Sequence, residues 1–264
     1  MKKIFTAAAF LMFLISLSVN NAQSENQGLV TDRPDQTESP LVVPLDAVQI
    51  ELGFVYQKQK YSQGMNSLEN DNLSLGSTLI RYGVSPNFEL RFGGEYFTGQ
   101  TLTNGLKTNI QGMQNLLFGG KLNLRKGEKI FSDIGIILQT ILPFGSEKLR
   151  TNNFVPKLLL SANQNISEST SFGFNLGIEK DLDSGINSYI YSGTLAYSIS
   201  ESLGTFFEFY GSALNESIPS NNFDLGITYL FKQNIQVDFS LGTSIITGDT
   251  DYFGGFGISI RLPK

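Results

Sequence analysis

The alternation of apolar and polar residues is the feature that most constrains how this chain can fold. From Asp46 onward, apolar side chains recur at every second position, which is the period of a β-strand. In the run 48–54, for example, apolar residues at even positions alternate with Gln49, Glu51 and Gly53. Twelve such runs follow one another between turn residues, and none has the period of a helix. The sequence therefore predicts an all-β chain.

Four of the runs are less regular than the others, namely 71–84, 130–142, 154–166 and 203–212. In the first of them, Leu73, Leu75 and Leu79 are out of phase with the apolar residues at 80, 82 and 84. A shift of one position within a strand indicates a β-bulge or a slip of register. We expect one of these in the run 71–84.

The connections between the runs alternate between two kinds. Short ones lie at 85–87, 126–129, 167–169, 200–202 and 232–234, and longer ones at about 58–70, 97–112, 143–153, 181–187, 213–221 and 246–251. An even-stranded up-and-down barrel with both termini on one side has this order. Short turns on the terminal side and longer loops opposite are the outer-membrane arrangement. The longer loops are nevertheless short for a receptor surface.

Alternation alone does not say whether the apolar face lies inside or outside the barrel. Twelve strands at ~4.7 Å spacing and a tilt of about 40° give a backbone diameter of roughly 24 Å, too wide for one apolar layer to fill. The polar face is rich in Gly, Ser, Asn and isolated charges, and Tyr and Phe gather near strand ends. We therefore predict an up-and-down antiparallel transmembrane β-barrel over residues 46–264. A soluble β-barrel or sandwich is the alternative.

The two ends of the chain fit export and assembly into an outer membrane. Lys2 and Lys3, the apolar run 4–19 and the small residue Ala22 are typical of a signal peptide over residues 1–22, with a membrane anchor as the alternative. The alternating run 255–262 resembles the C-terminal signal that barrel-assembly machinery reads. The expected location is the outer membrane of a Gram-negative bacterium. The expected partners are its lipids, the assembly machinery, periplasmic chaperones and a small-molecule solute.

Residues 23–45 fit no strand, because they are polar and interrupted by prolines. Three interpretations are open: a periplasmic leader into the first strand, a small plug whose charges enter the lumen, or a periplasmic docking motif. The candidate plug residues are Asp32, Arg33, Pro34, Asp35 and Glu38.

Composition excludes several classes of function. The chain has no His and no Cys, so neither a His- or Cys-based metal site nor a Ser-His or Cys-His nucleophile can be built. We expect no enzyme and no cofactor. Asp181 with Asp183, and Asp249 with Asp251, offer oxygen ligands for Ca²⁺, although acidic loop residues are more often simply solvated. The net charge of −5 argues against nucleic-acid binding.

The candidate functional residues are the ionisable side chains whose phase directs them into the lumen. They are Glu51, Arg81, Glu89, Arg91, Glu95, Lys121, Glu179, Glu208, Asp224, Asp238 and Arg261. They would either form a transverse field that orients solutes or pair with one another and fill the lumen. Glycines at inward positions would either leave space or relieve curvature.

Two stretches resemble a known family. The first is the run 29–44, Leu-Val-Thr-Asp-Arg-Pro-Asp-Gln-Thr-Glu-Ser-Pro-Leu-Val-Val-Pro, followed by Gln-Ile-Glu-Leu-Gly-Phe at 49–54. The second is Ile-Arg-Tyr-Gly-Val at 80–84, followed by Asn-Phe-Glu-Leu-Arg at 87–91. Both are similar to the outer-membrane proteins labelled as transporters of the phenol meta-cleavage pathway. The resemblance implies a β-barrel that passes small organic molecules.

Together these observations predict a channel or transporter for the passive passage of small organic solutes, aromatic or hydrophobic ones included. The alternative is a sealed structural or adhesion barrel whose function lies in its extracellular loops.

Overall fold

A computed structural model describes residues 28–63, 66–126, 132–214, 219–245 and 250–263. The predicted signal peptide, residues 1–22, lies outside the described residues, as does Asp249 of the second acidic pair. Within the described part of the chain, no helix is long and apolar enough to cross a membrane.

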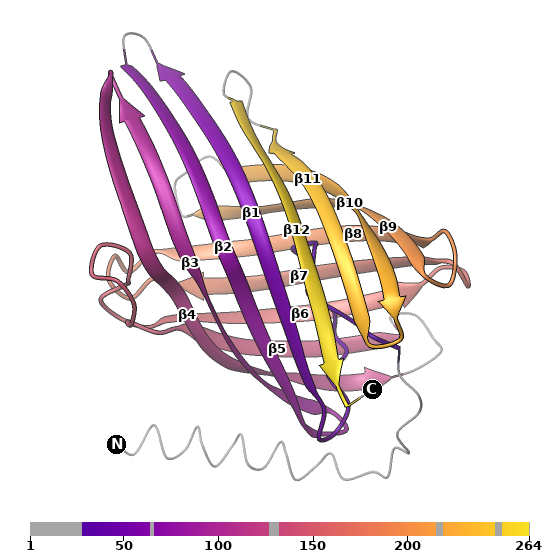
Figure 1. Ribbon diagram of the computed structural model, residues 1–264. Coiled ribbons are helices and arrows are strands. Elements are labelled where there is room, and N and C mark those ends of the chain that lie inside the picture. The colour runs from indigo at the N-terminus through magenta and orange to yellow at the C-terminus, as the bar shows by residue number, and fades with distance from the viewer. Residues whose placement is uncertain (1–27, 64–65, 127–131, 215–218, 246–249, 264) are drawn as a thin grey trace, which may run out of the picture.

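Twelve strands form one closed barrel, in which each strand pairs antiparallel with its neighbours in sequence and β1 pairs with β12 (Figure 1). The predicted all-β, up-and-down barrel is therefore confirmed. The strands are β1 (Val48–Gln63), β2 (Asn66–Ser85), β3 (Phe88–Thr103), β4 (Leu106–Lys126), β5 (Asp133–Ile141), β6 (Val155–Asn165), β7 (Thr170–Lys180), β8 (Asn187–Ser198), β9 (Leu203–Leu214), β10 (Ser220–Lys232), β11 (Ile235–Ser244) and β12 (Thr250–Leu262). We call the rim where β1 begins and β12 ends the terminal rim, and the opposite one the far rim.

Two of the predicted loops at the far rim, 58–70 and 97–112, are wrong. The strands extend through them, with pairing out to Gln63↔Asn66 in β1–β2 and to Thr103↔Leu106 in β3–β4. Figure 1 shows these hairpins rising past the rest of the barrel. Polar residues occupy both faces here, so the alternation that marks a strand is lost. The turn Asn104-Gly105, with φ of 49° and 86°, has the positive φ at both positions that a two-residue hairpin turn requires.

The bulge expected in the run 71–84 is confirmed, and it lies at Gly76. This residue has a φ of 63°, and the β2–β3 register shifts between Leu75 and Thr78. The extra residue restores the phase, so Leu75 and Ile80 are both exposed on the outer face. Leu79, which was out of phase with Ile80, faces the lumen instead, where it lines a cavity with Glu51.

The outer and inner faces of the barrel have opposite character. The outer face is apolar and exposed, as at the stacked pair Phe54–Phe256, with ring centroids 4.9 Å apart. On the inner face, by contrast, the largest fully buried side chains include Arg81, Lys121 and Glu89. This is the polarity of a transmembrane barrel, with its apolar face toward lipid.

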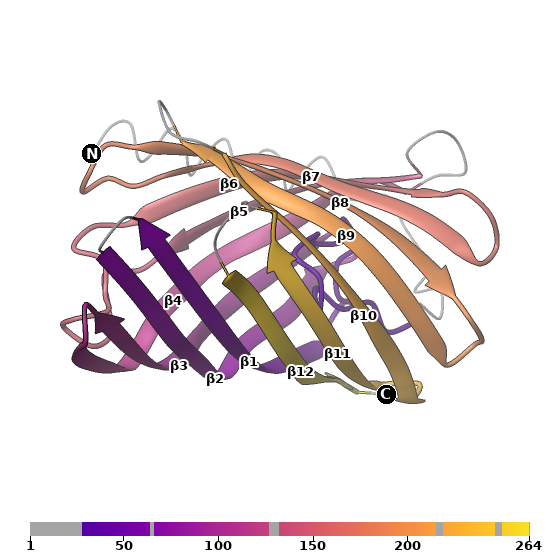
Figure 2. The same cartoon turned by 90° about the horizontal axis from the view of Figure 1, so that it is seen from above.

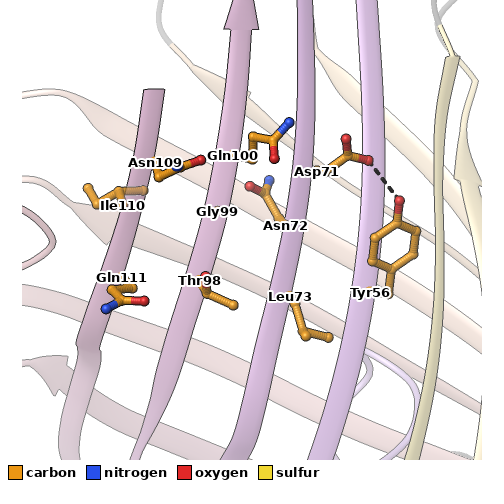
Figure 3. A pocket seen from close by; sticks show the side chains of 10 residues that line it. All are labelled: Tyr56, Asp71, Asn72, Leu73, Thr98, Gly99, Gln100, Asn109, Ile110 and Gln111. Carbon is orange, nitrogen blue, oxygen red and sulfur yellow. Dashed lines mark hydrogen bonds between the residues drawn. The ribbon is translucent and has the colours of Figure 1, made fainter. Parts of the chain in front are cut away.

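The outer face becomes polar toward the far rim. There, Tyr56 donates a 2.7 Å hydrogen bond to Asp71, and Lys58 pairs with Asp71 at 3.4 Å and with Glu69. A hollow of about 670 Å³ lies here over β1–β4. Figure 3 shows its lining, which consists largely of amide and hydroxyl side chains such as Gln100 and Asn109. The hollow lies apart from the lumen site described next.

Candidate functional site: a segment docked in the lumen

The chain before β1 lies inside the barrel. We call residues 28–47 the lumen segment, and Figure 2 shows its indigo trace within the ring of strands. Apart from the isolated bridge of Leu45 with Gly83, the segment forms no strand, so its backbone groups need other partners. Wall side chains accept hydrogen bonds from its N–H groups: Glu51 from Asp32 (3.0 Å), Glu89 from Val43 (2.7 Å), Asn175 from Glu38 (2.7 Å) and Glu208 from Gln36 (2.7 Å).

A buried ion cluster holds the first part of the segment. The Asp32 carboxylate lies 2.7 Å from Lys121 Nζ, 3.1 Å from Arg91 Nη1 and 3.3 Å from Arg81 Nη1. Arg81 also contacts Glu89 at 2.8 Å and Glu51 at 3.0 Å. The three cations come together because of the strand register. Arg81 and Arg91 are partners on β2 and β3, and Lys121 of β4 is the partner of Glu89, which lies two residues before Arg91 on β3. Asp32 is thus the segment's counter-charge for three wall cations.

The electrostatics of Asp32 follow from this geometry. Burial alone disfavours the ionised carboxylate, but Arg81, Lys121 and Arg91 outweigh it and lower the pKa of Asp32 below its ordinary value. The residue therefore stays ionised while the segment is docked.

A second anchor is Arg33, which pairs with Asp238 of β11 at 3.2 Å. Its guanidinium lies over Gly53 and Gly257, which are register partners on β1 and β12. A Cβ at Gly53 would lie 2.0 Å from Arg33 Nη1, and one at Gly257 would lie 2.5 Å from Arg33 Nε. Of the two uses that the sequence left open for inward glycines, space or relief of curvature, Gly53 and Gly257 provide space, and a side chain of the segment occupies it.

A third group is acidic and lies on the wall opposite Arg81. Glu208 and Asp224 are register partners on β9 and β10, both fully buried. Glu208 accepts a hydrogen bond from the Thr37 hydroxyl, and its carboxyl group lies beside that of Asp224. Burial, together with the charges of Glu208 and Asp224, raises the pKa of Asp35 well above its ordinary value.

The last anchor is Glu38. One of its carboxylate oxygens lies 2.5 Å from Arg91 Nη2, and the other lies 4.0 Å from Lys157 Nζ of β6. The backbone oxygen of Glu38 accepts hydrogen bonds from Ser161 (2.5 Å) and Asn175 (2.9 Å).

A cavity of about 320 Å³, which we call the vestibule, borders the segment on the side of the far rim. Arg91, Lys157, Glu38 and Glu95 line it together with the apolar side chains of Leu79 and Leu117. Residues 77–79 of β2 line the vestibule and precede Arg81 on this strand, which runs toward the terminal rim. The vestibule therefore lies on the far-rim side of Arg81.

The structure brings most of the predicted lumen residues together around the segment. Eight of them are buried on the inner wall: Glu51, Arg81, Glu89, Arg91, Lys121, Glu208, Asp224 and Asp238. Glu95 accepts hydrogen bonds from Gln114 (2.9 Å) and Asn115 (2.8 Å), and Arg261 donates one to the Gly28 carbonyl (3.0 Å). Glu179 is the register partner of Lys157 on β6 and β7.

The vestibule is bordered by all five of the predicted segment residues: Asp32, Arg33, Pro34, Asp35 and Glu38. Sequence reasoning missed Lys157, which lies in one of the irregular runs, and Asn175, which has an inward phase but no charge. Both bind Glu38.

The acidic loop residues bind protein groups. Asp183 accepts hydrogen bonds from the backbone of Asn152 (2.9 Å) and the side chain of Asn153, and Asp181 accepts one from Ser184 (2.7 Å). These bonds lower the pKa values of both aspartates. Among the described residues, no group of three or more His, Cys, Asp or Glu side chains could hold a metal ion.

Comparison with curated protein sequences gave no match. Among solved structures, the COG4313 outer-membrane channel from Pseudomonas putida F1 aligns with a TM-score of 0.62 at 13% identity, over 84% of this chain and 97% of the channel. The translocator domain of the autotransporter NalP from Neisseria meningitidis aligns at 0.58 and 8% identity, over 82% and 88%. The KdgM porin, solved with disordered oligogalacturonate, aligns at 0.51 and 11% identity, over 80% and 98%.

At these identities the structural likeness concerns the fold, which is that of outer-membrane barrels. The sequence itself carries the family assignment, because one family model matches residues 31–262, from the lumen segment to the end of β12. The chain belongs to the family described as "Putative MetA-pathway of phenol degradation".

Proposed function

We propose that this protein is an outer-membrane channel for small organic solutes, and that its lumen segment closes the pore while docked. The observation that carries the proposal is the way the segment is held. Residues 28–44 are anchored to the wall of a complete barrel by hydrogen bonds and ion pairs that involve side chains, whereas backbone pairing with Gly83 is confined to residues 45–47. The part before residue 45 can therefore leave without breaking the β-ladder.

The comparisons support the channel. The COG4313 protein is named an outer-membrane channel and KdgM a porin, and this chain shares their fold. The family description, which refers to phenol degradation, favours aromatic or hydrophobic solutes. The proposed setting is the outer membrane, reached by export with a cleaved signal peptide and by barrel assembly, with the far-rim hairpins outside the cell.

The dense buried contacts also suit a second function, a permanently sealed barrel that serves as a structural or adhesion platform. Swelling of proteoliposomes in a series of sugars and aromatic solutes of increasing size separates the two. The channel predicts solute uptake with a size limit once residues 23–45 are removed. A correctly folded, truncated barrel that passes no solute would establish the platform.

A further inference from the structure

The wall cations that hold the segment form a site for carboxylates. Asp32 and Glu38 are the two segment carboxylates bound there, and they differ in access to the vestibule. The Asp32 side chain is 2% exposed, whereas the Glu38 side chain is 13% exposed. Glu38 is therefore the carboxylate that a solute in the vestibule reaches first.

Glu38 does not use the full binding capacity of its partners. It meets Arg91 through Nη2, while Arg91 Nε has no hydrogen-bond partner among the described residues. Its contact with Lys157 is 4.0 Å long. A carboxylate that is free to orient can take both Nε and Nη2 of a guanidinium, which is the stronger, bidentate arrangement.

The vestibule has the size and character of a small-molecule site. Its volume of about 320 Å³ lies at the low end of known ligand pockets, which span about 300–1,000 Å³. The apolar side chains of Leu79 and Leu117 border it together with charged groups of both signs, and among these the cations Arg91 and Lys157 meet Glu38. A ligand that matches this pair of cations and the two leucines has a carboxylate and a compact apolar body.

We infer that the vestibule binds small organic carboxylates, which replace Glu38 on Arg91 and Lys157. Glu38 acts as a built-in competitor, so binding of such a solute releases one anchor of the segment. The inference rests on the proposed channel function, because it names the solute class and makes the solute itself the signal for opening.

The test is isothermal titration of the full-length folded protein in detergent with benzoate, and with benzamide as its uncharged isostere. Benzoate is expected to bind and benzamide is not. Glu38→Gln removes the competing charge and should tighten benzoate binding about tenfold, whereas Lys157→Gln should weaken it about tenfold. Opposite effects of two single charge removals within one site are not expected from general damage to the barrel.

Glu168→Gln and Lys148→Gln are the matched controls, since both residues are exposed and lie outside the lumen in a turn and a loop. Neither control should change benzoate affinity. Equal binding of benzoate and benzamide, or weaker benzoate binding in Glu38→Gln, would overturn the inference. Conductance of the truncated protein is recorded separately, so a channel that conducts without binding benzoate leaves the proposed function intact and refutes only the solute class.

Discussion

At the scale of single residues, Asp32 is the point where the buried charges meet. Three cations from three adjacent strands converge on its carboxylate, and two wall acids, Glu51 and Glu89, share Arg81 with it. Breaking a buried ion pair by removing one partner is far more costly than losing an exposed pair, because the remaining charge stays buried.

Asp32→Asn should therefore lower the free energy of unfolding by about 3 kcal/mol and undock the segment. Thermal unfolding of the protein in detergent measures the first effect, and cleavage after Glu38 by a glutamate-specific protease measures the second, since trypsin does not cut the Arg33-Pro34 bond. Glu168→Gln, an exposed change of the same charge, should stay within about 0.5 kcal/mol of the parent. An Asp32→Asn protein as stable and as protease-resistant as the parent would contradict this account.

Asp35 makes docking depend on pH in the opposite sense to Asp32. Because the docked pKa of Asp35 is raised by burial and by Glu208 and Asp224, its contribution to docking is full below its ordinary pKa and is lost as pH rises through the docked value. The Asp32 contribution, from a lowered pKa, is lost only when pH falls through that lower value.

Conductance of the full-length protein should therefore rise with pH above the ordinary pKa of Asp35. Asp35→Asn should abolish that rise and keep the segment docked at alkaline pH, since the neutral amide feels no repulsion from Glu208 or Asp224. Bilayer recordings of both proteins over the same pH series test this. Parallel pH profiles would show that another group controls opening.

At the scale of strands, the pairing of β1 with β12 closes the barrel and also shapes the site. The register places Gly53 beside Gly257, and Arg33 fills the space that side chains at these two positions would occupy. Alternation predicted the strands and the inward phase of these glycines. It could not show that a side chain from outside the barrel domain fills the gap, because no local pattern encodes that contact.

Gly53→Ala should push Arg33 away from Asp238 and open the pore while the barrel still folds, because the new methyl meets the far end of a flexible side chain. The expected readout is conductance above that of the parent, with unchanged heat-dependent migration of the folded barrel. Gly254→Ala is the control on the same strand pair, since its Cβ would meet only the Leu241 side chain at 3.0 Å and the Ser240 oxygen at 3.9 Å. Conductance equal to the parent in Gly53→Ala would remove Arg33 from the closure mechanism.

The far-rim hairpins show where strand prediction from alternation fails. Both faces of β1–β4 are polar near that rim, so 58–70 and 97–112 resemble loops in sequence although they are paired throughout their described residues. The Asn104-Gly105 turn is the local signal that identifies the second hairpin.

At the scale of the whole molecule, strand number, topology and the inward phase of the ionisable residues all follow from the sequence, because a period of two fixes which face each side chain takes. Where the segment 28–47 docks does not follow. Its position depends on long-range ion pairs, such as Asp32 with Lys121 and Arg33 with Asp238, which join residues far apart in the chain. Of the two purposes that the sequence left open for the inward charges, the structure shows mutual pairing, as between Arg81 and Glu89, and it adds one that the sequence did not show, which is to hold the segment.

The most direct test of the account is a planar-bilayer recording of the refolded mature protein beside the same protein lacking residues 23–45. The wall of the barrel is complete without the segment, whereas the lumen is occupied by it. We predict steady conductance from the truncated protein and a nearly closed full-length protein. Silence from a correctly folded truncated barrel, or equal conductance from both forms, would contradict the claim that this segment closes the channel.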